Sequence, residues 1–282
     1  MAKYRMLHER IAANAQAWNI ELLEPPAAGD DDLLRVHCPA YVHRMVTGAA
    51  SEQEMRRIGF PWSPMMVERS RRSSGGTIAA LRAALSGDGV AVNLAGGTHH
   101  AGFDRGGGYC VFNDSVIAAR HAQHAGLARR ILIVDLDVHQ GNGSAELCAG
   151  DDSIFTFSIH AAKIYPAIKP ASDLDVALPA GSNDADYLDA LARHLPVALA
   201  RSQADAVIYL AGADPYAGDR LGQLRLTKAG LAERDRQLLA ACRSRALPVA
   251  ISMAGGYAPV LEDIVDIHAE TVRLAAKSAL TH

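Results

Sequence analysis

Short apolar runs alternate along this chain with longer segments of helical pattern. Most of the runs are unbroken by polar residues, which is typical of strands buried on both faces of a parallel sheet. We expect strands at residues 90–94, 131–138, 154–159, 206–210 and 248–253, and a further short strand at 20–23. The sequence therefore predicts an α/β fold with a mostly parallel central sheet flanked by helices.

The segments between these strands carry helix-start signals and helical periodicity. Ser63-Pro64 is typical of a helix start, with a capping serine before an N1 proline, and Asn113-Asp114 is a second start signal. We expect helices at 3–17, 64–86, 114–126, 144–148, 186–201 and 228–245, short helices within 30–59, a last helix after 257, and loops at 95–108 and 160–184. Because no linker, repeat or low-complexity tract interrupts this order, residues 1–282 are expected to form a single domain.

Composition narrows the class of protein. The chain is 49% hydrophobic and 21% charged, which is typical of an ordinary globular protein. A formal net charge of −3 argues against direct nucleic-acid binding, which usually needs a basic surface. The four cysteines contain no C-x-x-C pair, so we expect neither a disulfide framework nor a cysteine zinc site. With no signal-peptide or membrane-spanning pattern, a cytoplasmic protein without membrane contact is expected.

Metal-capable side chains follow the apolar run at 131–134. Asp135, Asp137 and His139 would point to the same face if the strand persisted that far, and a glycine-rich turn follows them. A buried strand that ends in a solvated polar loop is the simpler explanation. Two carboxylates and one imidazole with an open position nevertheless suit a catalytic zinc ion, and they also accept iron(II) or manganese.

Polar side chains also follow three other expected strands. His99-His100 follows the first strand of the sheet, Asp214 follows the strand 206–210, and Tyr257 lies in a two-glycine turn after the strand 248–253. Carboxyl ends of parallel strands share one edge of the sheet, where ligands bind. The histidines are suited to proton transfer and the tyrosine to donation to a carbonyl oxygen. Each residue alone also has a purely structural explanation.

With these residues in view, the sequence resembles the zinc-dependent histone deacetylase family, and most closely its class IV and bacterial class IV-like members. The resemblance extends from about Lys3 to the C-terminus. It is carried by strings in a shared order, which are residues 96–101 (GGTHHA), 104–110 (DRGGGYC), 135–143 (DLDVHQGNG), 211–214 (AGAD), 218–222 (GDRLG) and 255–257 (GGY). The fold that this resemblance implies is the three-layer arginase/deacetylase fold.

The resemblance also implies roles for individual residues. Asp137, His139 and Asp214 would ligate zinc, His99 and His100 would form the general base and acid pair, and Tyr257 would polarise the amide carbonyl. Asp135 would orient His99, while Asn142 would take a place near His100 that some classes of the family fill with Asp. Because a carboxylate raises the basicity of its histidine more than an amide does, the two histidines should differ.

Further expectations from the resemblance concern a second cation and the substrate tunnel. A potassium site would use Asp135 and Ser158 with nearby backbone carbonyls. Tunnel residues would be Gly108, Tyr109, Ile164, Tyr165, Gly255 and Gly256, with Tyr109 where the family usually has Phe. The family's first strand and the loop after it have no counterpart before Lys3. An N-terminal edge strand is therefore expected to be absent.

The function implied is hydrolysis of an N-acyl-lysine side chain in a protein or peptide by metal-activated water. Within enzymes the alternatives are a deacylase of small N-acetyl amines such as acetylpolyamines and a long-chain fatty-acyl-lysine deacylase. An arginase-like two-metal hydrolase is disfavoured, because Gly141 stands where a second bridging carboxylate would be expected. The alternative outside enzymes is an inactive protein that binds acyl-lysine.

Overall fold

A computed structural model of the protein describes residues 2–87 and 89–279. The helices of these residues are α1 (Ala2–Trp18), α2 (Asp30–Leu34), α3 (Pro39–Thr47), α4 (Glu52–Ile58), α5 (Pro64–Ser86), α6 (Asp114–His124), α7 (Asn142–Leu147), α8 (Asp184–Ser202), α9 (Lys228–Arg243) and α10 (Leu261–Ser278). The strands are β1 (Val90–Asn93), β2 (Ile131–Asp135), β3 (Ile154–Ala161), β4 (Leu174–Leu178), β5 (Ala206–Leu210) and β6 (Val249–Ser252).

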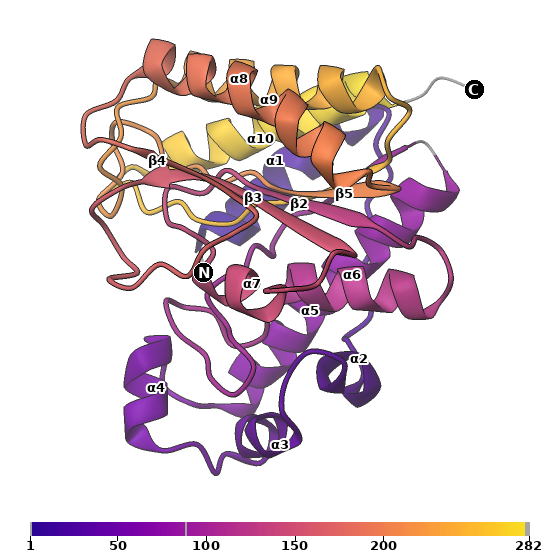
Figure 1. The fold of residues 1–282 in the computed structure, drawn as a ribbon, viewed down its shortest axis with the longest axis vertical. Coiled ribbons are helices and arrows are strands. Elements are labelled where there is room, and N and C mark those ends of the chain that lie inside the picture. Colours follow the sequence, from indigo (N-terminus) through magenta and orange to yellow (C-terminus); the bar gives the residue numbers. More distant parts are fainter. Residues whose placement is uncertain (1, 88, 280–282) are drawn as a thin grey trace.

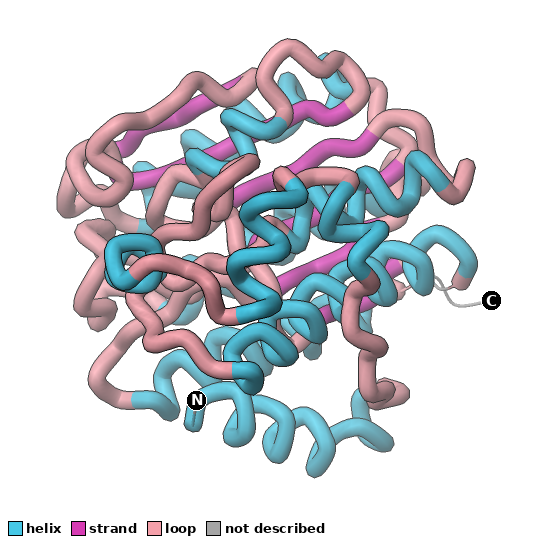
Figure 2. Tube along the Cα trace, turned by 90° about the horizontal axis from the view of Figure 1, so that it is seen from below, coloured by secondary structure: helices cyan, strands magenta, loops and turns pink. Residues whose placement is uncertain are grey.

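Within the described residues, the six strands form one sheet in the order β1-β6-β5-β2-β3-β4, and every pair in it is parallel. Helices α1, α8, α9 and α10 lie on one face, and α5 and α6 lie on the other, with α2, α3 and α4 beyond them (Figure 1). Figure 2 shows the strands side by side behind a layer of helices. The predicted α/β class with a parallel sheet in three layers is confirmed.

The unbroken apolar runs are explained by the two covered faces. In β2, Leu132 and Val134 belong to the core cluster on the α8–α10 side, whereas Ile131 and Ile133 belong to the cluster on the α5–α6 side. Strand β5 divides its residues between the same two clusters. Since both faces are buried, every position of these strands has to be apolar until the strand ends.

Capping side chains fix where the long helices begin. The side chain of Ser63 accepts a hydrogen bond from the backbone of Met66 at the start of α5, and Asn113 accepts one from Val116 at the start of α6. These bonds satisfy backbone donors that have no partner in the first helical turn. Both starts were predicted from the sequence, and the cap at Asn113 also fixes the loop that precedes it.

Three expectations about strands were wrong. Strand β2 ends at Asp135 instead of 138, because Oδ1 of Asp135 accepts a hydrogen bond from the backbone of Asp137 at 3.2 Å and turns the chain. Residues 20–23 form no strand, and Ile20 packs against the core cluster of the α8–α10 side. The loop expected at 160–184 contains β4, which pairs with β3.

No described helix combines the length and the hydropathy that crossing a bilayer requires.

Candidate functional site

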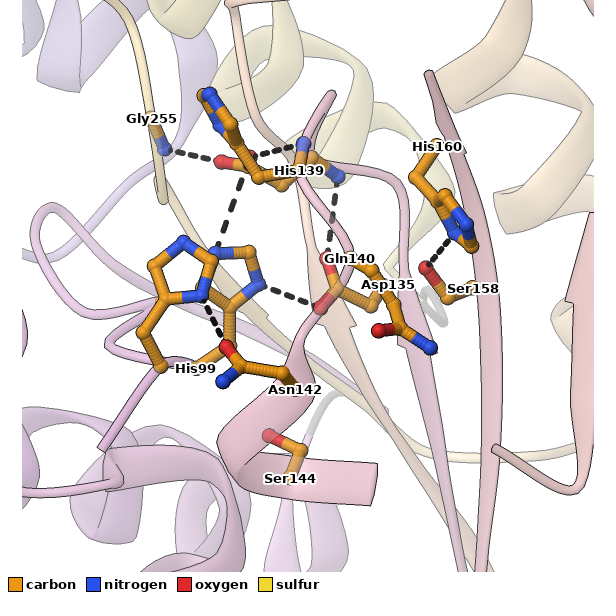
Figure 3. A network of polar contacts seen from close by, with 12 residues as sticks. His99, Asp135, His139, Gln140, Asn142, Ser144, Ser158, His160 and Gly255 are labelled. Atoms are coloured by element: carbon orange, nitrogen blue, oxygen red, sulfur yellow. Dashed lines mark hydrogen bonds and ion pairs between the residues drawn. The ribbon is translucent and has the colours of Figure 1, made fainter. Parts of the chain in front are cut away.

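The site lies at the carboxyl ends of the parallel strands, in the loops after β1, β2, β5 and β6. Asp137 and His139 follow β2, Asp214 follows β5, and Gly255 follows β6. Figure 3 shows His99, Asp135, His139, Asn142 and Gly255 gathered at this edge of the sheet. Carboxyl ends of parallel strands meet at one edge, so residues that are far apart in sequence converge here.

Three side chains present a set of metal-ligand atoms. One atom each from Asp137, His139 and Asp214 lies within 4.8 Å of the others, and all three residues are buried. Nδ1 of His139 lies 3.0 Å from Oδ1 of Asp137 and 3.3 Å from Oδ2 of Asp214. The strand-end turn at Asp135, rather than a continuous strand, brings Asp137 and His139 to the same point.

The two carboxylates are positioned by backbone donors. Oδ2 of Asp137 accepts the backbone N–H of Gly255 at 2.8 Å, and Oδ1 of Asp214 accepts that of Val138 at 2.9 Å. Oδ2 of Asp214 is buried and makes no hydrogen bond, since its contact with Nδ1 of His139 at 3.3 Å does not have hydrogen-bond geometry. Burial and the charge of Asp137 raise the pKa of the Asp214 carboxyl. A buried acceptor without a donor, beside a second carboxylate, is what a divalent cation would satisfy, so these residues fit the expected ion.

The loop that carries His99 and His100 is fastened by buried polar residues. Asp114, the first residue of α6, accepts the backbone N–H groups of Gly97 at 3.0 Å and Thr98 at 2.7 Å. A Cβ on Gly97 would lie 2.4 Å from Cα of Ala254, so glycine is needed where this loop meets the loop after β6. The cap sequence at 113–114 indicated a helix start, but nothing in the sequence indicated that Asp114 would hold the histidine loop.

The two histidines have different partners. Nδ1 of His99 lies 2.6 Å from Oδ2 of Asp135, and Nδ1 of His100 lies 2.7 Å from Oδ1 of Asn142. Their ring centroids are 4.0 Å apart. Burial acts against a charged His99, but the charges of Asp135 and Asp137 outweigh it and raise the pKa of His99 to about 9.

The pKa of His100 is shifted in the opposite direction. Burial and the neighbouring charge of His99 lower the pKa of His100 well below its ordinary value of 6.5. The amide of Asn142 contributes a hydrogen bond without a full charge. The pair therefore presents one imidazolium and one neutral imidazole in the same pocket.

Tyr257 lies beside this centre on the turn after β6. Its backbone N–H donates to Oδ2 of Asp219 at 2.6 Å, and its ring centroid lies 5.7 Å from that of Tyr109. Burial, together with the charges of Asp137 and Asp214, raises the pKa of the Tyr257 phenol. Nζ of Lys3 donates to the carbonyl of Gly256 at 3.0 Å and lies 5.0 Å from the Tyr257 ring centroid. The phenol is therefore a neutral hydrogen-bond donor.

A cavity of about 2440 Å³ contains the site. Its lining includes Gly108, Tyr109, Tyr165, Gly255 and Gly256, which are five of the six expected tunnel residues. The ring centroids of Tyr165 and His100 are 4.8 Å apart in an edge-on arrangement. The side chain of Tyr109 is 43% exposed.

Ile164, the sixth expected tunnel residue, is not among the described residues that line this cavity. Its side chain packs against the core cluster on the α8–α10 side, and its carbonyl accepts a hydrogen bond from Nζ of Lys169 at 2.7 Å. Its neighbour Tyr165, in the bend that precedes Pro166, does line the cavity.

The two residues expected at a potassium site lie side by side. Asp135 of β2 and Ser158 of β3 are partners in the parallel register. Oγ of Ser158 also contacts Nδ1 of His160 at 2.9 Å, and His160 lies beside it in Figure 3. His160 and Gln140 belong to this buried polar group, although the sequence pattern gave no reason to single them out.

Comparisons with known proteins relate the chain to one family. The model of the histone deacetylase domain matches residues 1–272. An uncharacterized protein of Picosynechococcus sp. is 43% identical over 275 residues, which cover 98% of this chain and 91% of that protein. Histone deacetylase 2 of Arabidopsis thaliana is 32% identical over 246 residues, covering 84% of this chain. That alignment spans 63% of the plant protein, which is less than two thirds of its length.

Two solved structures share the fold. The HD domain of HDA15 superposes with a TM-score of 0.80 at 23% identity, over 97% of this chain and 83% of that one. Acetylpolyamine aminohydrolase from Burkholderia pseudomallei superposes with a TM-score of 0.75 at 22% identity, over 95% of this chain and 89% of that one.

Proposed function

The chain belongs to the histone deacetylase family, and from that premise we propose that it is a metal-dependent amidohydrolase that removes an acyl group from an N-acyl-lysine side chain. One observation carries this proposal. The ligand atoms of Asp137, His139 and Asp214 lie within 4.8 Å of one another, and Oδ2 of Asp214 is left without a hydrogen bond.

Asp137, His139 and Asp214 would hold the ion, for which zinc is our first choice and iron(II) our second. A divalent ion there supplies Lewis-acid chemistry, because it polarises a carbonyl group and lowers the pKa of water. The carboxylates keep their orientation through the backbone donors of Gly255 and Val138. The imidazole of His139 lies between them and completes the set.

His100 would act as the general base, because the neutral imidazole of the pair can accept a proton. Water attacks the carbonyl carbon while one of its protons passes to His100, the C–N bond then breaks, and the proton is returned to the departing lysine nitrogen. The products are a carboxylic acid and a free amine. His99, held by Asp135, stays protonated and stabilises negative charge that develops in the pocket.

Tyr257 would donate its hydroxyl hydrogen to the carbonyl oxygen of the substrate. The raised pKa keeps the phenol protonated throughout the working pH range. Lys3 supports this role because it ties the carbonyl of Gly256 to α1 and places a positive charge over the tyrosine ring. Tyr109 and Tyr165 would flank the aliphatic part of the lysine side chain.

Two finer assignments belong to the same proposal. Asp135 and Ser158 would contribute to a potassium site beneath the catalytic ion, which their pairing in the register of β2 and β3 supports. Membership of the class IV-like branch is supported by the sequence strings and by the contact of Asn142 with His100.

Two other substrate classes have some support. The structural similarity to an acetylpolyamine aminohydrolase favours a small N-acetyl amine as the second candidate. The cavity continues from Asp137 past Val92 of β1 to Ala276 of α10, with a lining that is largely apolar, and this favours a long acyl chain as the third. Turnover of acetyl-lysine peptide, myristoyl-lysine peptide and acetylpolyamine under one set of conditions separates the three classes.

The mechanism is tested by the variants Tyr257→Phe and His100→Ala. We expect each to lower kcat by about 100-fold or more, since each removes a group that acts on the reacting atoms, while the metal content stays that of the wild type. Metal content and turnover are measured on the same samples.

Two outcomes would contradict the proposal. Near-normal turnover in both variants would refute the assigned roles. Tight binding of acylated peptide by the metal-loaded wild type, with no product after long incubation, would favour the alternative of an inactive acyl-lysine-binding protein.

A further inference from the structure

Arg234 is a fully buried cation that the catalytic proposal does not use. It lies on α9 with its Cζ 5.8 Å from the ring centroid of Tyr209. Its Nη1 donates to the carbonyl of Gly212 at 2.6 Å and to that of Leu136 at 3.3 Å. Burying a guanidinium group is costly unless its donors find acceptors; within the described residues Nε and Nη1 have acceptors, whereas Nη2 is buried without a hydrogen bond.

The two carbonyls belong to the loops that carry the candidate metal ligands. Leu136 directly precedes Asp137, and Gly212 lies two residues before Asp214. One guanidinium nitrogen thus joins the loop after β2 to the loop after β5, behind the carboxylates. A Cβ on Gly212 would lie 2.8 Å from Cα of Asp137, so the two loops are already in close contact here.

The position of Arg234 is itself fixed from behind. Its Nε donates to Oδ1 of Asp235 at 2.9 Å. The carboxylate of Asp235 also accepts hydrogen bonds from the hydroxyls of Tyr209 and Thr271, which belong to β5 and α10. Three elements therefore hold one side chain in place, and that side chain holds two loops.

Two other hydrogen bonds between the loops differ in kind from those of Arg234. Val138 donates to the carboxylate of Asp214, and Gly255 donates to the carboxylate of Asp137. These bonds use oxygens of the groups that would bind the ion, so their strength changes with the charge at the site. The bonds of Arg234 go to backbone carbonyls and do not compete with a metal for ligand atoms.

We propose that Arg234 is a positioning residue that holds Asp137 and Asp214 at metal-binding distance by joining their loops from behind. The part of this inference that concerns the ion rests on the proposed function. Positioning groups outside the ligand set typically change metal affinity by about 10- to 100-fold when they are mutated.

The test is zinc affinity, measured by competition with a chromophoric chelator on folded protein, in Arg234→Lys. Lysine keeps the charge but loses the guanidinium group, whose Nη1 donates to both carbonyls while its Nε is held by Asp235. We expect zinc to bind about 10- to 100-fold more weakly than in the wild type. Asp235→Asn, which leaves Arg234 in place but weakens its anchor, is the second variant and should show a smaller loss in the same direction.

A general loss of stability is separated from the positioning role by Leu199→Ala. Leu199 lies in the buried face of α8, three residues before the end of that helix. This end of α8 leads into the amino end of β5, away from the metal-binding edge of the sheet. A cavity there lowers the free energy of unfolding, so the control is destabilised without a change at the site. We expect its zinc affinity to stay within about twofold of the wild type. Thermal unfolding is measured for all variants, so that zinc affinities are compared between proteins of similar stability.

Zinc affinity within about twofold of the wild type in folded Arg234→Lys or Asp235→Asn would overturn the proposal, as would an equal loss in Leu199→Ala. A wild-type protein that binds no zinc would overturn it together with the metal assignment. Turnover is measured separately. If zinc binds tightly but no acyl substrate is hydrolysed, the proposed function fails while the result for Arg234 still stands.

Discussion

At the scale of single residues, the site depends on glycines as much as on ligands. The Cα of Gly255 faces the two candidate carboxylates. A Cβ on it would lie 1.9 Å from Oδ2 of Asp214 and 2.6 Å from Oδ2 of Asp137. Any side chain would occupy the space that an ion needs. The sequence predicted Gly255 only as a tunnel residue, because a glycine-rich turn does not reveal which atoms it approaches.

We expect Gly255→Ala to lose at least about 10-fold in zinc affinity while the protein stays folded, since the methyl group displaces a ligand carboxylate. Gly29→Ala is the matched control, because a Cβ at Gly29 meets no atom within 4 Å. Isothermal titration with zinc measures both variants. Equal zinc affinity in Gly255→Ala and the wild type would show that the ion binds elsewhere.

Asn142 sets the two histidines apart, and Asn142→Asp tests this. A carboxylate at this place would raise the pKa of His100, which burial and His99 now keep well below 6.5. Because His100 must be neutral to accept a proton, the acidic limb of the pH profile of kcat/KM should move to higher pH. An unchanged limb would indicate that His100 is not the base, and Glu146→Gln on the same helix serves as the control.

Residues that act through backbone groups were the ones that the sequence did not reveal. Asp137, His139, Asp214 and the histidine pair were predicted because metal-capable side chains at strand ends form a recognisable pattern. Arg234 bonds to carbonyls 22 and 98 residues away, and no motif marks such contacts.

At the scale of elements, the loop between β1 and α6 carries His99 and His100 and is held by the buried His37, which lies between α2 and α3. Nδ1 of His37 lies 2.8 Å from the carbonyl of Gly102, and Nε2 accepts the backbone N–H of Asn113 at 3.0 Å. The second bond needs an unprotonated nitrogen. Burial lowers the pKa of His37 to about 4 in the folded protein, against 6.5 without burial.

A folded pKa below the unfolded pKa means that the unfolded chain binds the proton more tightly. The stability from His37 is therefore complete above pH 6.5 and is lost as the pH falls toward 4, by up to about 3 kcal/mol. Urea unfolding at pH 7 and pH 4 measures this loss. It should shrink in His37→Gln and persist in the control His8→Gln on the exposed side of α1. The same acid-induced loss in all three proteins would contradict the assignment.

Long elements were predictable and short ones were not. The helices α5, α6 and α8 and the strands β1 and β5 begin or end near the expected residues, because capping residues and two-sided burial leave clear patterns. Strand β4 lies at the edge of the sheet, and its side chains alternate between partly buried and exposed before the buried Leu178. This alternating sequence is a weaker strand signal than an unbroken apolar run. The end of β2 at Asp135 depended on one side chain bonding to its own backbone.

At the scale of the whole molecule, the two hydrophobic clusters build a scaffold whose chemistry lies at one edge. Strands β2 and β5 are adjacent in the middle of the sheet and bring Asp137 and Asp214 together. The hydrogen bond between their loops joins Val138 to Asp214, which are 76 residues apart in the sequence. This convergence follows from the strand order, which local sequence patterns do not encode. The resemblance to a known family predicted that Asp137 and Asp214 share one metal site, but the strand order itself was not predicted.

The most direct measurement of the central claim is zinc titration of metal-free protein, with zinc content and hydrolysis of acetyl-lysine, myristoyl-lysine and acetylpolyamine substrates followed together. We predict one tightly bound ion per chain, turnover of at least one substrate that rises in proportion to bound zinc, and neither binding nor turnover in Asp214→Asn. Full turnover in the metal-free protein, or unchanged zinc binding in Asp214→Asn, would contradict the account.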